Sequence, residues 1–136
     1  MRKDDCIFCK IANGEIPSRT VYEDDKFRAV LDLGPATDGH TLILPKDHAD
    51  NLFDLPEDYA KALIPTAQKI ASKMKDNLKC DGLNLVQNNG EVAGQTVMHF
   101  HLHLIPRYEN DGQRIGWKPG SRSDEEFEAI RKNIVG

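Results

Sequence analysis

The chain has 136 residues, a length that fits one domain over residues 1–136. Its formal net charge is −4 and its Lys and Arg residues are scattered, so a nucleic-acid partner is disfavoured. No stretch approaches the roughly 20 apolar residues that span a bilayer, so we expect a cytoplasmic protein with no membrane association. In that reducing compartment the three cysteines are poor disulfide candidates.

The first half of the chain predicts one short helix and three strands. Residues 6–12 favour a helix that ends at Asn13-Gly14. Strands are expected at 20–22 and 27–31, joined by an acidic turn, and at 41–44, where Pro45 closes the apolar run.

The second half predicts one long helix, two strands and a terminal helix. Asp54 and Glu57 fit a capping box, and the helix after them runs to about Lys79 with apolar residues at helical spacing, namely Leu55, Tyr59, Leu63, Ala67, Ile70 and Met74. Strands are expected at 83–87 and 98–105. Ser123 and Glu126 fit a second capping box, which starts a helix with Phe127, Ile130 and Ile134 on one face.

The connections between the first three strands are too short for helical crossovers, and only one long helix separates the remaining strands. This arrangement favours the α+β class. We therefore expect a mainly antiparallel sheet of about five strands, with one long helix and a short C-terminal helix.

The informative segment is residues 98–105, in which His99, His101 and His103 alternate with apolar residues. On a strand the three imidazoles would share one face while the apolar residues enter the core. Ordinary surface or core histidines rarely occur in strict alternation opposite an apolar face. Alternating histidines on a strand also suit zinc, so a metal site is an alternative.

This segment resembles the signature of the histidine triad family. Three other parts of the chain also resemble segments of the family. They are Gly94-Gln95-Thr96-Val97 before the triad, Gly39-His40-Thr41-Leu42-Ile43-Leu44-Pro45-Lys46-Asp47-His48, and Cys6-Ile7-Phe8-Cys9-Lys10-Ile11 with Gly14-Glu15-Ile16-Pro17. The likeness covers nearly the whole chain to about Tyr108, and it is strongest to the nucleotide-binding branch, particularly bacterial members with the CxxC pair.

The resemblance implies the fold of that family and a nucleotidyl-histidine intermediate on His101. Imidazole chemistry supports this, because a neutral imidazole is nucleophilic near pH 7. The resemblance further implies that the phosphoryl charge is stabilised by His103, Gln95, Thr96 and the backbone N–H groups of residues 90–94. It also implies that Gln95 or His103 assists the leaving group. His40 would line the active site.

The resemblance also implies a purine nucleotide pocket, for substrates such as AMP or GMP conjugates. Asp32 matches the acidic residue that binds the ribose hydroxyls in relatives, a role that suits a carboxylate. The other nucleotide-binding candidates are Ile7, Phe8, Ile11, Val30, Leu33, Asn88 and Gly94, together with Gln95, Thr96, His101 and His103. For Ile7, Phe8 and Val30, ordinary core packing is an equally good interpretation.

Cys6-x-x-Cys9 by itself fits either metal ligands or a redox pair. Relatives with this pair hold a structural Zn²⁺, and the matching ligands here are Cys6, Cys9, His48 and His99. A closed Cys2His2 tetrahedron has no open position, so the zinc would be structural. No thioredoxin-like βαβ pattern surrounds the pair, which disfavours the redox alternative.

Two other function classes stay open on the sequence alone. One is a nucleotide-binding or regulatory module with negligible turnover, and the other is a metallohydrolase with zinc on the three alternating histidines. The sequence leaves the leaving group open among phosphoramidates, adenylates and dinucleoside polyphosphates. The family resemblance and an expected unpaired sheet edge predict a homodimer, in which Trp117 would reach the partner's active site.

Overall fold

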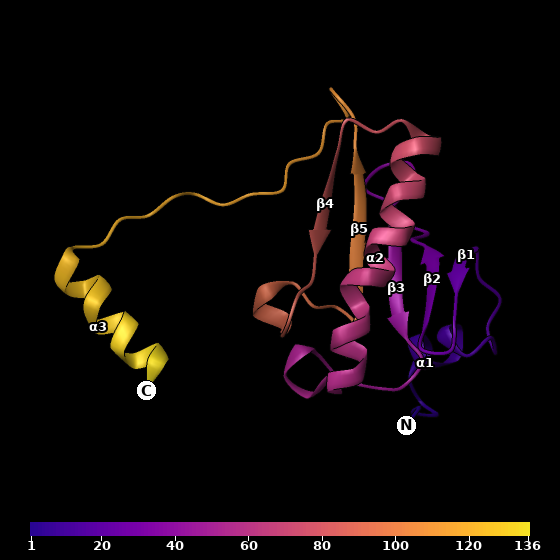
Figure 1. Cartoon of the computed structure of the whole chain (residues 1–136), viewed down its shortest axis with the longest axis horizontal. Helices are drawn as coiled ribbons and strands as arrows, with labels where there is room; N and C mark the ends of the chain where they lie inside the picture. The colour runs from indigo at the N-terminus through magenta and orange to yellow at the C-terminus, as the bar shows by residue number, and fades with distance from the viewer.

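The computed structural model describes all 136 residues and contains a five-stranded antiparallel sheet in the order β1-β2-β3-β5-β4 (Figure 1). The strands are β1 Thr20–Glu23, β2 Phe27–Leu31, β3 Thr41–Pro45, β4 Gly82–Val86 and β5 Leu102–Arg107. The helices are α1 Ile7–Ala12, α2 Glu57–Leu78 and α3 Asp124–Val135, with short 3-10 turns η1 Leu52–Asp54 and η2 Glu91–Ala93. The expected α+β architecture is confirmed.

The sheet is covered on both faces, because apolar side chains of β2 and β3 alternate between them. The α2 face holds the larger core cluster, which includes Phe27, Ala29 and Ile43. The α1 face holds a smaller cluster with Val30 and Leu42. β3 is therefore buried on both faces, and all five of its residues are buried.

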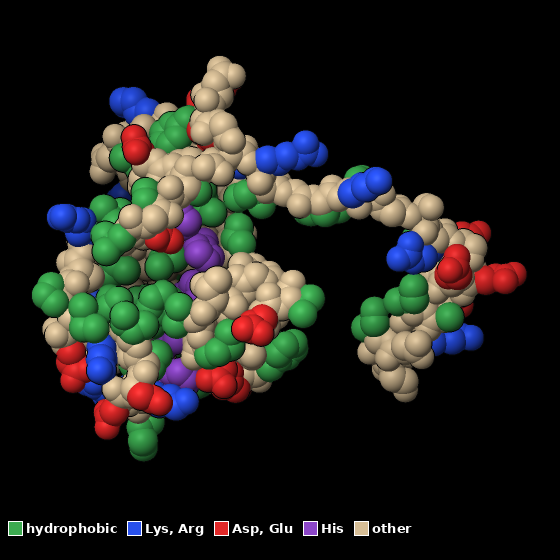
Figure 2. All heavy atoms as spheres, turned by 180° about the vertical axis from the view of Figure 1, so that it is seen from behind, with side chains coloured by type: hydrophobic (Ala, Val, Ile, Leu, Met, Phe, Trp, Pro, Cys, Tyr) green, Lys and Arg blue, Asp and Glu red, His purple; other side chains and the backbone are tan.

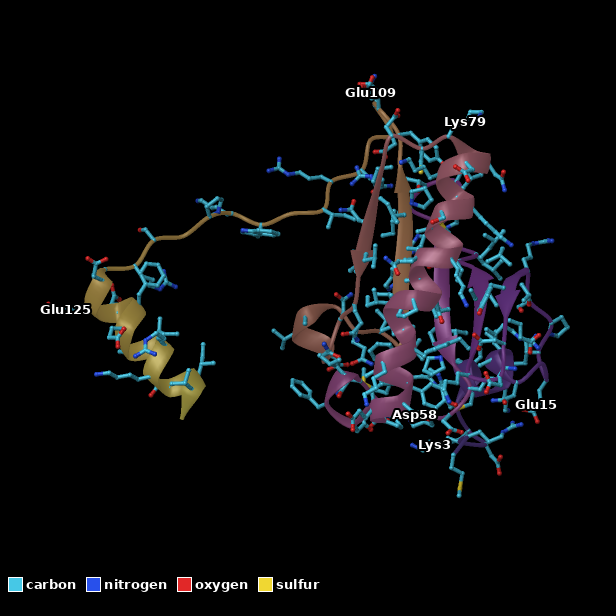
Figure 3. The ribbon with its side chains drawn as sticks, in the orientation of Figure 1. Lys3, Glu15, Asp58, Lys79, Glu109 and Glu125 are labelled. Carbon is cyan, nitrogen blue, oxygen red and sulfur yellow. The ribbon has the colours of Figure 1, made fainter.

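The long helix α2 begins differently from the sequence prediction but ends where it was expected. The capping box expected from Asp54 and Glu57 is wrong: Asp54 instead closes a box with Asn51 around η1, and α2 starts at Glu57 after Pro56 without a side-chain cap. At the other end, the helix ends at Leu78 and Lys79 adopts the left-handed conformation with φ 54°, in agreement with the predicted end at about Lys79 (Figure 3). The predicted buried stripe is confirmed from Tyr59 to Met74, whereas Leu55 precedes the helix.

The fifth strand is shorter at its start than predicted, because the ladder begins at Leu102 rather than at residue 98. The backbone N–H of Phe100 donates to Ala49 O at 2.7 Å instead of joining a ladder bond. His99 uses its side chain to reach Pro45 O at 3.0 Å. The alternation nevertheless holds, since Phe100, Leu102 and Leu104 all enter the α2-side core.

The C-terminal arm, Arg114–Gly136, lies apart from the rest of the chain. Every residue from Gly112 onward is exposed, and α3 lies beyond β4, on the opposite side of the molecule from β1 (Figure 1). Its side chains, including Glu125, project into solvent (Figure 3). No helix of the chain is both long enough and apolar enough to cross a membrane.

Candidate active site and metal cluster

The five histidines lie in a row on the α1 face of the sheet, within a hollow bordered by hydrophobic side chains (Figure 2). His48 and His99 lie 5.2 Å apart by ring centroid. His101 and His103 are 5.0 Å apart, and His103 and His40 are 5.1 Å apart. Phe8 of α1 packs edge-on against both His99 and His101, so it stands between the two ends of the row.

His101 presents one nitrogen to the hollow because the other is engaged. Its Nδ1–H donates to the backbone oxygen of His99 at 2.7 Å. A neutral imidazole carries one proton, so this bond leaves a lone pair on Nε2. No protein group lies within hydrogen-bond distance of Nε2, and the side chain lines a pocket. The arrangement is that of an imidazole ready to act as a nucleophile.

His40 and His103 form a relay of hydrogen bonds whose direction the backbone sets. The N–H of Ala36 donates to His40 Nδ1 at 2.9 Å, so His40 carries its proton on Nε2 and donates it to His103 Nδ1, also at 2.9 Å. His103 must then carry its own proton on Nε2. The relay therefore turns His103 into a hydrogen-bond donor toward the pocket that it lines.

Burial keeps both members of the relay neutral near pH 7. It lowers the pKa of His103 to about 4, with the neighbouring His101 and His40 adding to the effect. Burial also lowers the pKa of His40, against an opposing effect of the Asp32 carboxylate. Asp32, His40 and His103 are close enough to be considered as metal ligands, but a His40 that donates through Nε2 has no lone pair there for an ion.

The pocket beside His101 has a volume of about 430 Å³, within the range of small-molecule sites. Nine of the twelve predicted nucleotide-binding residues line it: Ile7, Phe8, Ile11, Val30, Asp32, Leu33, Thr96, His101 and His103. One carboxylate oxygen of Asp32 accepts from Gly34 N at 2.8 Å. The other, Oδ2, forms no short hydrogen bond, lying 3.6 Å from His40 Nε2.

Gln95, Gly94 and Asn88, the other three nucleotide-binding candidates, do not line this pocket. Gln95 is 2% exposed and its amide is fully engaged, accepting from Gly90 N and donating to the carbonyls of Asp50 and Val97. It therefore holds the loop before the triad together. Gly94 has φ 101°, and a Cβ there would press on the Asn88 amide at 3.3 Å, which explains a glycine in this turn.

Part of the pocket wall was not predicted from the sequence. Ile16, Pro17, Ser18 and Arg19 line it, together with Leu31 and Leu42. The segment before β1 is brought there because Leu31 N donates to Arg19 O at 3.0 Å, beyond the end of the β1–β2 ladder. The Gly14-Glu15-Ile16-Pro17 resemblance was the only signal for this segment.

The four predicted metal ligands meet at the other end of the row. Ligand atoms of Cys6, Cys9, His48 and His99 all lie within 4.8 Å of one another. The Nδ1 of His99 is 3.3 Å from Cys6 Sγ and 3.4 Å from Cys9 Sγ. Cys9 Sγ is also 3.4 Å from His48 Nδ1. In a tetrahedral zinc site the S···N edges are about 3.5 Å, so the donor set fits Zn²⁺.

Both histidines of this cluster are oriented by acceptors outside it. The Nε2–H of His99 donates to Pro45 O at 3.0 Å, and that of His48 donates to the Asp50 carboxylate at 2.7 Å. Each Nδ1 lone pair is thereby directed at the cysteines, the pattern found around metal-bound histidines. Burial raises the pKa of the Cys9 thiol to about 11 and lowers the pKa of His99 to about 4. Burial by itself therefore favours a neutral thiol at Cys9 and a neutral imidazole at His99.

Comparison with known sequences gives matches along the whole chain. The family model described as the HIT domain matches residues 13–110. An uncharacterized HIT-like protein of Methanocaldococcus jannaschii is 45% identical over 131 residues, which cover 96% of this chain and 99% of that protein. The adenosine 5'-monophosphoramidase HNT1 of Saccharomyces cerevisiae is 43% identical over 131 residues, covering 96% of this chain and 80% of that protein.

Solved structures agree with these matches. A HIT family member from Bacillus subtilis superposes with a TM-score of 0.91 at 42% identity, covering 97% of this chain and 96% of that one. A zinc-bound histidine triad family protein from Mycobacterium smegmatis superposes with a TM-score of 0.75 at 35% identity, covering 96% of this chain and 94% of that one.

Proposed function

The chain belongs to the HIT domain family, and we propose that it hydrolyses purine nucleotide conjugates at the α-phosphorus through a covalent nucleotidyl intermediate on His101. The observation that carries the proposal is the 2.7 Å bond from His101 Nδ1 to the backbone oxygen of His99. It leaves the Nε2 lone pair facing the pocket and offsets the charge that Nε2 gains when it bonds to phosphorus.

The reaction has two displacements. In the first, the Nε2 lone pair of His101 forms a bond to the α-phosphorus while the bond to the leaving group breaks and the leaving group takes up a proton. In the second, water attacks the same phosphorus and releases a proton to solvent, the P–N bond breaks, and His101 Nε2 regains its lone pair. Two displacements split one difficult step into two easier ones.

His103 contributes a fixed donor to both displacements. Its Nε2–H faces the pocket that His101 lines, where negative charge builds on the phosphoryl oxygens. A preorganised donor stabilises that charge without reorganising during the reaction. His40 acts through His103, because its Nε2–H holds His103 in the donor tautomer. We therefore assign His40 a positioning role, and Gln95 the support of the loop.

The remaining lining of the pocket suits the nucleoside half of such a substrate. Ile7, Phe8, Ile11 and Val30 offer apolar faces for a purine base. Asp32 at the pocket edge retains a carboxylate oxygen that can accept from the ribose hydroxyls. Among AMP and GMP conjugates, the similarity to a yeast adenosine 5'-monophosphoramidase supports adenosine phosphoramidates as the first substrates to test.

For the Cys6, Cys9, His48 and His99 cluster we propose a bound structural Zn²⁺. The fit of the donor set to a tetrahedron and the zinc-bound relative from M. smegmatis support it. Bound there, the ion would neutralise the two thiolates and tie α1 to the end of β3 and the segment before β5. We also propose that the protein is a cytoplasmic homodimer, as the sequence analysis predicts.

A trapping experiment tests the proposed chemistry. The protein is mixed briefly with adenosine phosphoramidate labelled at phosphorus and denatured at alkaline pH, where a phosphoryl-histidine bond survives. We expect label on the chain at His101, lost on mild acid treatment, and none on His101→Ala. Turnover by the wild-type protein without any labelled intermediate would refute covalent catalysis. AMP binding without turnover of any of the three substrate classes would favour the alternative, a nucleotide-binding module.

A further inference from the structure

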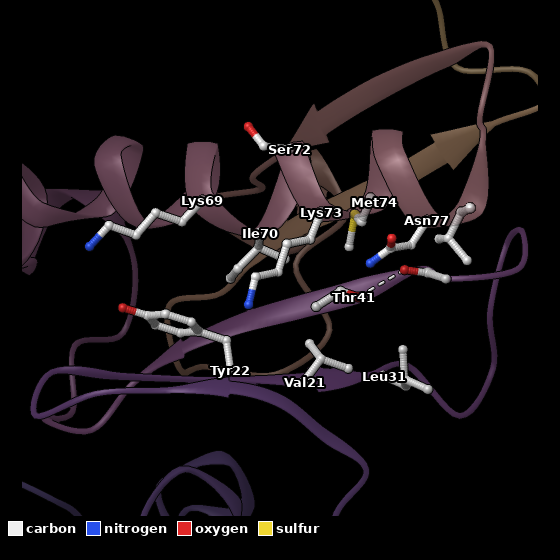
Figure 4. Close-up of a pocket in the computed structure, with 12 residues that line it drawn as sticks. Val21, Tyr22, Leu31, Thr41, Lys69, Ile70, Ser72, Lys73, Met74 and Asn77 are labelled. Carbon is white, nitrogen blue, oxygen red and sulfur yellow. Dashed lines mark hydrogen bonds between the residues drawn. The ribbon is translucent and has the colours of Figure 1, made fainter.

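A groove of about 750 Å³ runs between α2 and the first three strands, on the α2 side of the sheet (Figure 4). The proposed nucleotide chemistry does not use it. Apolar side chains from both sides line it, namely Val21, Leu31, Ile70, Met74 and Leu78. Val21 and Leu78 remain 47% and 41% exposed, so this apolar surface is open to solvent.

Two lysines of α2 add positive charge to the groove. Lys69 and Lys73 extend from the helix along it (Figure 4). Neither lysine has an ion-pair partner, because the ion pairs of the chain all involve other residues. The groove therefore suits a partner that combines an apolar stripe with negative charge.

The C-terminal helix has that combination and no partner of its own. Its apolar residues Phe127, Ile130 and Ile134 recur at helical spacing and are 58%, 45% and 79% exposed. Its first turn carries three carboxylates, those of Asp124, Glu125 and Glu126. An isolated helix of 12 residues is marginal in water, so the stripe needs a surface to cover it.

We propose that α3 of one copy of this chain docks into the α2–β1 groove of a second copy, and that the exchange is reciprocal. Docking would cover the apolar stripe and the open groove together, and it would bring the acidic first turn of α3 near Lys69 and Lys73. A reciprocal exchange is closed by one two-fold axis, as most homodimers are.

The topology favours a second copy over the chain's own groove. The groove lies at the β1 end of the sheet, whereas the arm extends past the opposite edge, β4 (Figure 1). A second sheet joined edge to edge at β4 would continue in the order β4-β5-β3-β2-β1. Its groove would then fall on the side of β4 toward which α3 extends.

The length of the arm agrees with this placement. At a strand spacing of about 4.8 Å, the far groove lies roughly 25–30 Å from β5 of the first copy. The last side chain that anchors the arm is Gln113, which donates to Ala36 O. The ten residues from Arg114 to Ser123 can span roughly 33–36 Å when extended, which suffices.

Two full-length variants test the docking. The helix variant, Ile130→Lys with Ile134→Lys, places charge on the stripe, and the groove variant, Val21→Glu with Leu78→Glu, places negative charge in the groove. All four positions are exposed, so the sheet should still fold. Ala129→Lys, on the opposite face of α3, and Val92→Glu, which is fully exposed on η2, serve as matched controls.

The measurement is hydrogen exchange of the α3 amides, with mass by light scattering. We expect the wild type and both controls to be dimers with protected α3 amides, and each variant to exchange in α3 roughly tenfold faster. An α3 in the wild type that exchanges as fast as in the variants would overturn the proposal.

A heterodimer of the two variants decides between exchange and self-docking. It is isolated by two different tags after co-expression, and the α3 peptides of the two chains differ in mass. In an exchanged dimer, the unaltered α3 of the groove variant docks into the unaltered groove of the helix variant. The amides of the α3 that belongs to the groove variant should then regain their protection from exchange. If its protection does not return, α3 does not dock on a second copy, and the proposal is wrong.

Discussion

The two ends of the histidine row use the same side chain for opposite purposes. At the cysteine end, His99 donates through Nε2 to Pro45 O and turns Nδ1 toward two thiols. Two residues later, His101 donates through Nδ1 and turns Nε2 toward the pocket. The difference shows that the acceptor behind each ring decides which nitrogen is free, and the groups in front of that nitrogen decide its chemistry.

The two ends are nevertheless joined by one backbone group. The oxygen that fixes the tautomer of His101 belongs to His99, a proposed metal ligand. We therefore expect substitutions at the reactive end to change mainly turnover, and substitutions at the metal end to change mainly zinc content and stability. A substitution at the metal end should also lower turnover slightly, through the His99 backbone.

The largest effect should come from His101→Ala. Removing the proposed nucleophile should lower turnover at least about a thousandfold, or about 4 kcal/mol of barrier. Zinc content should stay as in the wild type, because His101 is not one of the four proposed ligands. Rates with adenosine phosphoramidate and elemental analysis measure both. More than a tenth of the wild-type rate would contradict the assignment.

Cys6→Ser should show the reverse pattern. If the cluster holds zinc, the variant loses about one ion per chain and about 3 kcal/mol of unfolding free energy, because metal binding contributes to folding. Turnover should fall less than about tenfold, through the shared His99 backbone. Cys80→Ser is the matched control, since Cys80 is a free thiol outside the cluster. Wild-type protein prepared without chelator that contains almost no zinc would exclude the site.

The half-buried imidazole of His103 should make the fold sensitive to acid. Its pKa in the folded protein is about 4, against 6.5 for a free imidazole, so between these values the unfolded chain binds a proton that the folded chain does not. Stability contributed by the neutral imidazole is present above pH 6.5 and is lost as the pH falls toward 4, by about 1.4 kcal/mol per pH unit.

His103→Gln, which cannot titrate, isolates this contribution. Denaturant unfolding of the variant should show a shallower decline between pH 6.5 and 4 than the wild type, by about the same slope. Parallel declines would show that His103 is not kept neutral by burial.

The smallest effect should come from the relay. His40→Ala removes the donor that fixes His103, so turnover should fall about tenfold, about 1.4 kcal/mol, with AMP binding little changed. His40→Gln can still donate an amide N–H and should recover much of the loss. Stopped-flow rates and AMP titration separate these outcomes. Equal rates for the alanine and glutamine variants would mean that His40 only fills space.

The sequence predicted the helices and strands because local patterns carry that information. Alternation placed Phe100, Leu102 and Leu104 in the α2-side core, as found. The family resemblance placed nine of twelve nucleotide-binding candidates on one pocket. Gln95 escaped prediction, because nothing local shows that its amide is consumed by the carbonyls of Asp50 and Val97.

The start of β5 shows the limit of pattern alone. Residues 98–101 alternate as a strand would, yet Phe100 bonds to Ala49 and His99 to Pro45. The acceptors of the Phe100 backbone N–H and of the His99 side chain both come from a segment some fifty residues away, which no local periodicity encodes.

By itself, the sequence determined the α+β class and the alternation of histidines with core residues, because both depend on residue type and short spacing. The four sulfur and nitrogen side chains of the proposed metal cluster came from the family resemblance. Only the tertiary structure decided which nitrogen each histidine offers, that the Gln95 amide bonds to the loop before the triad, and that α3 lies uncovered beyond β4. A tautomer depends on the acceptor that long-range packing brings behind the ring, and an uncovered face depends on what the rest of the chain has already buried.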